Sequence, residues 1–163
     1  MIFMENGTGK AIEAKVLNTF ASVAATLGYS PIHGKIIGAL LIKGKPASLQ
    51  GVARSAGYSI SMVSISIDFL EVTGVVKRVK KTGDRKLYIE LQGDLLEALK
   101  TLILSKVAKG IKSSMEDFDA EKKNIAKIKS PEERKEIENA VNVLEKEIMR
   151  LDKYVKLLSG MKL

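Results

Sequence analysis

The hydrophobic positions of the chain follow helical spacing at both ends and alternate along a short stretch in the middle. Within residues 10–27 apolar side chains recur every three or four positions, and Gly28 follows as a helix terminator. A second helix is expected to begin at Ser30-Pro31, a capping serine before a proline, and to end at Gly44. The apolar face predicted for the first helix consists of Ile12, Val16, Phe20, Val23 and Leu27.

A helix-turn-helix pattern occupies the centre of the chain. Gly57 lies four residues after Ala53, and Val63 follows six residues later. Two short crossing helices need these offsets: a small residue at the crossing, a residue that tolerates positive φ in the turn, and an apolar residue between the helices. Ser48 and Ser59 precede the two helices as N-caps.

The second helix of this motif is expected over residues 59–73, with Gly74 as its terminator. Its predicted core-facing residues are Ile60, Val63, Ile67 and Leu70, and its predicted outward residues are Ser61, Met62, Ile65, Ser66 and Phe69. The outward face contains no Lys or Arg, and the only charges of the helix are Asp68 and Glu71. This face therefore differs from the basic surface expected of a helix that binds DNA.

Alternating hydrophobic and polar positions occupy residues 75–91, with Thr82-Gly83-Asp84 between two runs. This pattern predicts a β-hairpin. Residues 75–92 contain six basic and two acidic residues, so they carry +4 of the net charge of +8. Clustered positive charge is typical of phosphate-binding surfaces. A helix-turn-helix followed by a basic hairpin predicts a winged helix.

Residues 93–163 are expected to form long helices with a coiled-coil seam. Ser130-Pro131 together with Glu133 gives a specific start signal for the last helix. Seven apolar residues of this helix follow a strict four-three spacing: Ile137, Val141, Leu144, Ile148, Leu151, Val155 and Leu158. Such a seam needs a covering surface, and three remain open: the preceding long helix, the first helix at residues 8–28, or a second copy of the chain.

The composition argues against several kinds of site. The chain has no cysteine and one histidine, His33, so no metal site and no cofactor are predicted, and His33 is expected at the surface or in a capping role. No nucleophile is paired with a base, so an enzyme is not expected. No apolar stretch approaches the roughly 20 residues that cross a bilayer, and the N-terminus does not resemble a signal peptide. We expect a cytoplasmic protein without a membrane partner.

Taken together, these motifs resemble those of the MarR-type winged-helix repressors, and more narrowly the GbsR-like branch, repressors of betaine synthesis, with its archaeal relatives. The resemblance covers Tyr29 to Gly93. It rests on Ser30-Pro31, Gly34-Lys35-Ile36, Ser59, Val63-Ser64, Leu70-Glu71, Gly74-Val75-Val76, Arg78, Gly83-Asp84-Arg85-Lys86 and Tyr88. It implies an α-α-β-α-α-β-β-α-α topology, dimerisation through the terminal helices, a recognition helix in the major groove, and a wing whose Arg85 approaches the minor groove while Asp84 organises the turn.

The resulting prediction is a mainly α-helical protein with a small β-hairpin wing. Residues 8–92 would form a winged helix-turn-helix DNA-binding domain, and residues 93–163 a helical dimerisation region. We expect a homodimeric transcriptional regulator that binds double-stranded DNA with full or partial sequence specificity. The predicted DNA-binding residues are Ser59, Ser61, Met62, Ser64, Ile65 and Ser66 in the helix and Lys77, Arg78, Lys80, Lys81, Arg85 and Lys86 in the wing.

A second hypothesis assigns the chain to a different class, a winged-helix protein-interaction module. Its docking face would be the apolar stripe Met62, Ile65, Phe69 and Val72. A small-molecule effector stays open, because MarR-type proteins often bind one. No specific effector is predicted, since a quaternary-ammonium site needs an aromatic cage and the chain has four Phe, four Tyr and no Trp.

Overall fold

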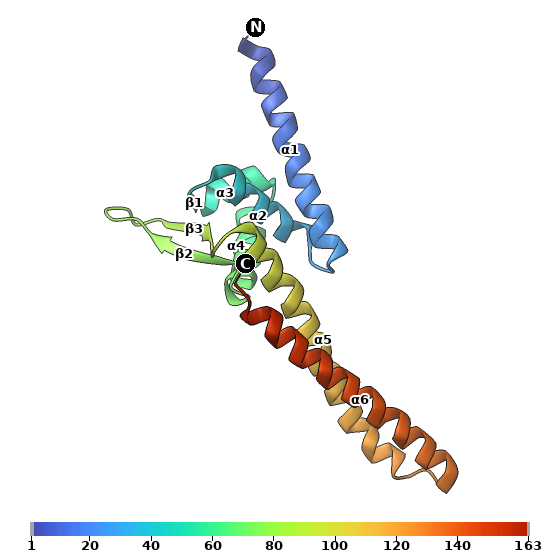
Figure 1. Ribbon diagram of the computed structural model, residues 1–163. Coiled ribbons are helices and arrows are strands. Elements are labelled where there is room, and N and C mark those ends of the chain that lie inside the picture. The colour runs from blue at the N-terminus through green and yellow to red at the C-terminus, as the bar shows by residue number, and fades with distance from the viewer. Residues whose placement is uncertain (1, 163) are drawn as a thin grey trace. The chain divides into compact units, whose positions relative to one another are not determined.

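The structure is a computed structural model that describes the backbone of residues 2–162 and the side chains of residues 7–162. Its elements, labelled in Figure 1, are α1 (Ile2–Thr26), α2 (Pro31–Lys43), β1 (Ala47–Ser48), α3 (Leu49–Ala56), α4 (Ile60–Val72), β2 (Val76–Lys80), β3 (Leu87–Leu91), α5 (Leu95–Ile125) and α6 (Pro131–Gly160). The chain divides into two compact units, one up to Leu99 and one from Lys100 onward.

The order of these elements is the α-α-β-α-α-β-β-α-α topology that the resemblance implies. The fold class is confirmed: helices dominate, and a three-stranded antiparallel sheet in the order β1-β3-β2 forms the only sheet of the described chain. In the hairpin, Arg78 lies opposite Ile89. The short strand β1 pairs Ala47 with Ile89 at the other edge of β3. The short strand β1 therefore joins the hairpin to the helix-turn-helix at one edge of the sheet, and β2 forms the other edge (Figure 1).

The core of the first unit lies where α2, α3, α4 and the base of the sheet meet. Side chains with less than 2% relative exposure come from each of these elements and include Ile36, Val52, Val63, Ile67, Leu70, Val75, Val76 and Ile89. Val63 lies between the helices of the motif, as its position after Gly57 predicts. The same core therefore fixes the positions of α4 and of the first strand of the wing.

Helix α1 packs on α2 with close backbone contact at Gly34. An added Cβ at Gly34 would lie 2.1 Å from the carbonyl oxygen of Phe20. The apolar face predicted for α1 is partly wrong: Ile12 and Val23 are 58% and 43% exposed, whereas Leu17 and Ala24 are buried. Gly34 and Gly38 lie against Leu17, Phe20 and Ala21, so the face of α1 that packs on α2 is shifted from the predicted apolar stripe.

The second unit contains α6 and all but the first turn of α5, which run antiparallel as a hairpin (Figure 1). Ser130 caps α6 by accepting a hydrogen bond from the backbone N–H of Glu133 at 3.3 Å, and Pro131 occupies the first turn, as predicted. Lys122 and Glu145 join the helices at 2.7 Å. Among the described residues from 100 onward, only Leu102, Ile111, Ile125 and Val155 are buried. The helical hairpin of α5 and α6 thus has almost no core of its own.

The predicted seam of α6 is divided between two surfaces. Its members Val141, Ile148 and Val155 are half-buried or buried, whereas Ile137, Leu144 and Leu151 are 37%, 53% and 42% exposed. The exposed members recur every seventh residue and end at the half-buried Leu158. We call Ile137, Leu144, Leu151 and Leu158 the heptad ridge. The interpretation that the seam packs on the preceding helix therefore accounts for only part of it.

Candidate nucleic-acid interface

The helix-turn-helix is built by local capping interactions. The hydroxyl of Ser48 accepts a hydrogen bond from the backbone N–H of Gly51 at 3.1 Å and begins α3. Gly57 ends α3 with φ of 75°, a left-handed conformation that favours glycine. The hydroxyl of Ser59 then accepts from the N–H of Met62 at 3.2 Å and begins α4. These three predicted positions fix where the exposed face of α4 begins.

The burial of α4 corrects two expectations. Ser66, predicted to face outward and contact DNA, is only 6% exposed, because it lies three residues after Val63 and four before Leu70, on the buried stripe of the helix. Ile60, predicted to face the core, is 49% exposed, since the first turn of α4 extends past the packed core. Ser66 therefore lies outside the accessible part of the candidate interface.

The other predicted residues of α4 are accessible. Ile65 is 71% exposed and Met62 is 50% exposed. Ser59 and Ser61 are exposed, and Ser64 is half-buried. With Ile60, the first half of α4 therefore presents hydroxyl groups and three apolar side chains to its surroundings.

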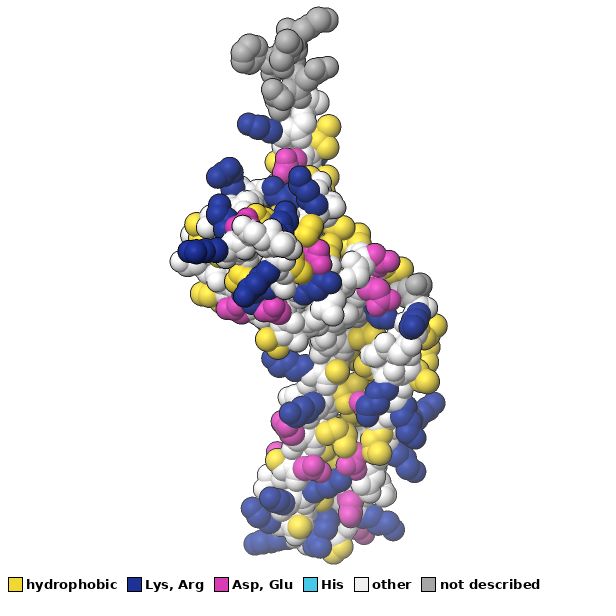
Figure 2. All heavy atoms as spheres, turned by 90° about the vertical axis from the view of Figure 1, so that its left-hand side faces the viewer, with side chains coloured by type: hydrophobic (Ala, Val, Ile, Leu, Met, Phe, Trp, Pro, Cys, Tyr) yellow, Lys and Arg dark blue, Asp and Glu magenta, His cyan; other side chains and the backbone are white. Residues whose placement is uncertain are grey.

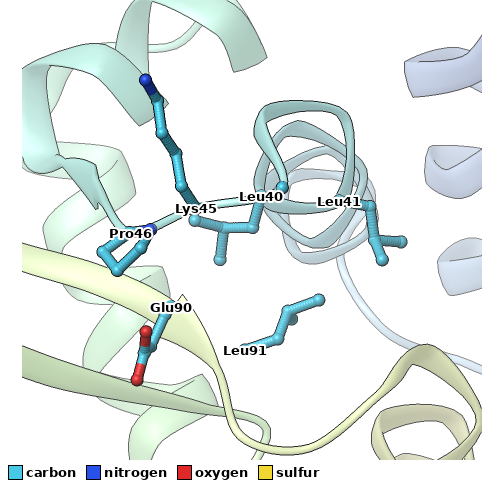
Figure 3. Close-up of a pocket in the computed structure, with 7 residues that line it drawn as sticks. Leu40, Leu41, Lys45, Pro46, Glu90 and Leu91 are labelled. Atoms are coloured by element: carbon cyan, nitrogen blue, oxygen red, sulfur yellow. The ribbon is translucent and has the colours of Figure 1, made fainter.

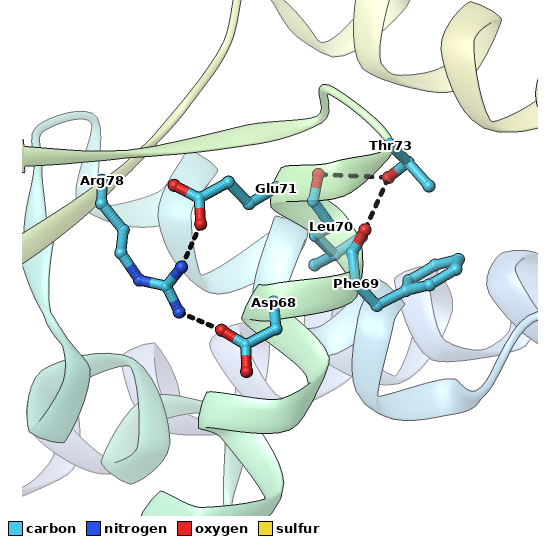
Figure 4. A network of polar contacts seen from close by, with 6 residues as sticks. All are labelled: Asp68, Phe69, Leu70, Glu71, Thr73 and Arg78. Atoms are coloured by element: carbon cyan, nitrogen blue, oxygen red, sulfur yellow. Dashed lines mark hydrogen bonds and ion pairs between the residues drawn. The ribbon is translucent and has the colours of Figure 1, made fainter.

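The second half of α4 is acidic, and a basic residue of the wing neutralises it. Arg78 on β2 donates a hydrogen bond from one guanidinium nitrogen to the carboxylate of Asp68 and from another to that of Glu71 (Figure 4). The hydrogen bond with Asp68, together with the negative charges of both carboxylates, raises the pKa of Arg78, while burial opposes this rise. Arg78, predicted to contact phosphate, is thus engaged within the molecule.

The opposite side of the wing contains a second ion pair. Lys77, also predicted to contact phosphate, lies 3.1 Å from Glu90 on the neighbouring strand. Both side chains are partly exposed, so solvent screens their attraction. This cross-strand pair stabilises the hairpin weakly and leaves Lys77 partly accessible.

The tip of the wing is organised around Asp84. Its carboxylate accepts hydrogen bonds from the hydroxyl of Tyr88 at 2.7 Å and from the backbone N–H of Lys86 at 2.9 Å. These bonds, with that of Tyr88 first, lower the pKa of Asp84, and they raise the pKa of Tyr88. The ammonium of Lys81 lies 4.1 Å from the centre of the Tyr88 ring. Gly83 supplies the positive φ of the turn, at 81°.

Four basic side chains of the wing remain without an ion pair to a carboxylate among the described residues. They are Lys80, Lys81, Arg85 and Lys86. Figure 2 shows Lys and Arg side chains gathered where the wing points towards the viewer. With Asp84 as the only acidic residue between positions 80 and 86, this tip carries a local excess of positive charge. We call these four residues the wing-tip cluster.

An aromatic cluster beside α4 was not predicted. The ring of His33 stacks on Phe69 with centroids 4.7 Å apart, and Tyr29 approaches Phe69 at 5.9 Å. His33 was expected at the surface, but it is half-buried, its Nδ1 is buried without a hydrogen-bond partner, and burial lowers its pKa. No spacing rule relates residues 33 and 69, so only the packing of α2 against α4 could reveal this contact.

A shallow pocket of about 260 Å³ lies between the end of α2 and strand β3 (Figure 3). Leu40, Leu41, Pro46 and Leu91 supply apolar surface, and the charged ends of Lys45 and Glu90 point away from one another (Figure 3). No group of side chains in the described chain could hold a metal ion. No described helix is long and apolar enough to cross a membrane. The wing and α4 therefore remain the surface with the most pronounced chemistry.

Comparisons with known proteins support the fold. No family model and no curated protein matches the chain by sequence. A crystallised transcriptional regulator matches with a TM-score of 0.67 and 15% identity over 91% of this chain and 95% of its own. The S. aureus MepR F27L mutant bound to an oligodeoxyribonucleotide gives a TM-score of 0.44 at 14% identity, covering 88% of this chain and 97% of its own. The transcriptional regulator Tm0710 from Thermotoga maritima gives a TM-score of 0.43 at 15% identity, covering 94% of this chain and 99% of its own. The chain has the fold of a winged-helix transcriptional regulator.

Proposed function

We propose that this protein is a homodimeric transcriptional regulator of the MarR type that binds double-stranded DNA. The wing-tip cluster supports this function most strongly, because its four basic side chains form no ion pair with a carboxylate among the described residues. The GbsR-like branch, a cytoplasmic location and the absence of enzymatic activity belong to the same proposal. So does a docking mode in which Arg85 enters the minor groove and α4 lies in the major groove.

The first half of α4 would supply the base contacts. Hydroxyl groups of Ser59, Ser61 and Ser64 can bond to several base edges, and Met62 or Ile65 can touch a thymine methyl group. None of these side chains makes the bidentate contact by which arginine reads guanine. We therefore expect modest base specificity and a large contribution from phosphate contacts.

The salt dependence of DNA binding follows from the number of basic side chains that are available to neutralise phosphates. If all six predicted basic residues of the wing neutralised phosphates, log K against log salt would have a slope of about −5.4 per protomer. Because Lys77 and Arg78 are paired with carboxylates, the wing-tip cluster alone gives a slope of about −3.6.

This function is tested by removing charge from the wing tip. The double variant Arg85→Ala/Lys86→Ala should reduce the slope by about 1.8 per protomer and weaken retention of duplex DNA strongly at moderate salt. A matched control, Lys10→Ala/Lys15→Ala, removes two exposed charges from α1 and should leave the slope unchanged. Equal binding by the wing variant and the wild-type protein would contradict the proposed function.

Dimerisation through the second unit forms part of the proposal. The helical hairpin of α5 and α6 buries only four side chains among its described residues, and this burial cannot offset the entropy lost when two long helices become ordered. The heptad ridge adds apolar residues at the seven-residue spacing typical of helices that pack side by side. Ile103 lines a small apolar pocket together with Leu158, so α5 contributes to the same apolar surface. A second copy of the chain would cover it.

The dimer is tested with charged substitutions on and off the ridge. Leu144→Lys/Leu151→Lys should convert a dimer into monomers in sedimentation equilibrium. Val143→Lys/Leu157→Lys changes residues of similar exposure, 60% and 69%, that lie outside the ridge, and this pair should remain dimeric. A wild-type protein that sediments as a monomer at micromolar concentration would refute this part of the proposal.

The exposed apolar face of α4 favours one alternative function, a module that docks a protein partner. Ile65 and Val72 are 71% and 88% exposed and lie seven residues apart, on the same side of the helix, and a contiguous exposed apolar patch marks an interaction surface. Phe69, by contrast, is packed against His33, so its substitution would disturb the fold as well as the surface. The structure therefore makes Val72 the better probe of this hypothesis.

Val72→Ser separates the two functions because it removes apolar surface without adding charge. It should leave DNA retention intact if α4 enters DNA through its first half. A protein that loses its regulatory effect with Val72→Ser but keeps it with Arg85→Ala/Lys86→Ala would support docking of a protein partner instead.

A further inference from the structure

We propose that Arg78 is a positioning residue that locks the wing to the recognition helix, and that it is not a phosphate ligand. This inference rests on the proposed binding of DNA. It concerns how the wing-tip cluster and α4 are held in one geometry, so that both can reach the same duplex.

The geometry of the contact fits a lock. Asp68 and Glu71 are three residues apart, so they project from one side of α4. Arg78 contacts each carboxylate through a different terminal nitrogen (Figure 4). A guanidinium is planar and offers its donors in a fixed fork, so two acceptors on one helix restrain both its position and its orientation. Its side chain is 27% exposed, much less than the 51% of Lys77 on the same strand.

The contact adds to the packing at the base of the wing, where Val75, Val76 and Ile89 are buried in the core shared with α4 and where β1 pairs with β3. The N–H of Val75 donates to the carbonyl oxygen of Leu70 at 2.9 Å, and Val76 is buried at the start of β2. In the described chain, no other side-chain ion pair or hydrogen bond connects α4 to the hairpin. Beyond Arg78 the hairpin extends to a tip that lies free of the helices (Figure 1). The Arg78 contact therefore limits how far the tip can swing.

The charges favour the same role. Asp68 and Glu71 are 63% and 38% exposed, and α4 contains no basic residue. An arginine that left them for a phosphate would expose two carboxylates beside the DNA backbone. Repulsion between these carboxylates and phosphate would oppose the gain from the new contact. Arg78 is therefore more effective when it remains on α4.

The inference is tested by comparing positions 78 and 85 with the same two substitutions. Arg85 is a proposed phosphate contact, so Arg85→Ala should lower the salt slope by about 0.9 per protomer, and Arg85→Lys should restore it. Arg78→Ala should weaken DNA binding by about two- to fivefold without changing the slope. Arg78→Lys should fail to restore binding, because an ammonium cannot span both carboxylates. Circular dichroism checks that each variant is folded.

A second measurement does not depend on DNA. The chain has no cysteine, so Val72→Cys and Thr82→Cys allow spin labels to be placed at the end of α4 and at the wing tip. In a sample diluted with unlabelled protein, the distance distribution should be narrow with Arg78 and broad in Arg78→Ala and Arg78→Lys. Arg85→Ala should leave it narrow.

The two measurements separate the inference from the proposed function. If the spin-label distance distribution broadens in the Arg78 variants but no form of the protein binds DNA, the positioning role of Arg78 stands and the proposed DNA-binding function is refuted. An unchanged distribution in Arg78→Ala would overturn the lock. A slope reduced by about 0.9 in Arg78→Ala, restored by Arg78→Lys, would identify Arg78 as a phosphate ligand and overturn it too.

Discussion

The crossing of α1 and α2 gives a sharp prediction, because backbone rather than side chains surrounds one glycine. In Gly34→Ala the new Cβ would lie 2.1 Å from the carbonyl oxygen of Phe20 and 2.9 Å from the backbone nitrogen of Ala21. Ordinary van der Waals contact begins near 3.4 Å, so α1 has to move back by about 1.3 Å. No rotation of a side chain can relieve this clash.

The cost of that movement can be estimated from two opposing effects. Overpacking of a tight contact costs about 1–3 kcal/mol, and separation of α1 from α2 also loosens the burial of Leu17 and Ala24. Replacing glycine by alanine inside a helix returns about 0.5–1 kcal/mol. We therefore expect Gly34→Ala to lower the free energy of unfolding by about 1–2 kcal/mol.

Urea denaturation followed by circular dichroism measures the effect, and two glycines serve as controls. At Gly38 a Cβ meets only side chains, at 3.1–3.3 Å, so a smaller loss is expected. At Gly110 nothing lies within 4 Å, so alanine should stabilise α5 by about 0.5–1 kcal/mol. A Gly34→Ala variant as stable as the wild-type protein would refute the close crossing of α1 and α2.

Three further predictions concern the core, the pH dependence and the wing. Ile67→Ala should cost about 2–5 kcal/mol in urea denaturation, whereas Ile65→Ala, on the exposed face, should change stability by less than about 0.5 kcal/mol; similar losses would contradict the orientation of α4. Burial lowers the pKa of His33 in the folded protein below its unfolded value. The free energy of unfolding present above about pH 6.5 should therefore fall as the pH drops through the folded pKa. His33→Phe should flatten this loss between pH 7 and 5. Tyr88→Phe removes the bond that lowers the pKa of Asp84, so an NMR titration should show that pKa rising; no change would exclude the hydroxyl as its cause.

Local chemistry explains why much of the fold could be predicted from sequence. Ser48, Gly57 and Ser59 each act through contacts within four residues, and each performs the predicted role. The start of α6 at Ser130-Pro131 was predicted for the same reason. Alternation of residues 75–91 predicted the hairpin, because side chains of a strand point alternately to opposite faces.

The errors and omissions occur where an outcome depends on contacts distant in sequence. Arg78 was counted among the phosphate contacts, since its sequence neighbours are basic, but its partners lie on α4. Ser66 was placed on the side away from the predicted core stripe of α4, yet helical geometry turns it inward. The four-three spacing of α6 predicted a seam, but it could not show that only part of the seam packs within the hairpin.

The central claim, binding of duplex DNA as a dimer, is tested most directly by selecting bound duplexes from a random pool at two salt concentrations. We predict retention that falls steeply with salt and enrichment of a palindrome whose half-sites lie about one helical turn apart. Retention at low salt no greater than that of Arg85→Ala/Lys86→Ala, with no enriched sequence, would contradict it.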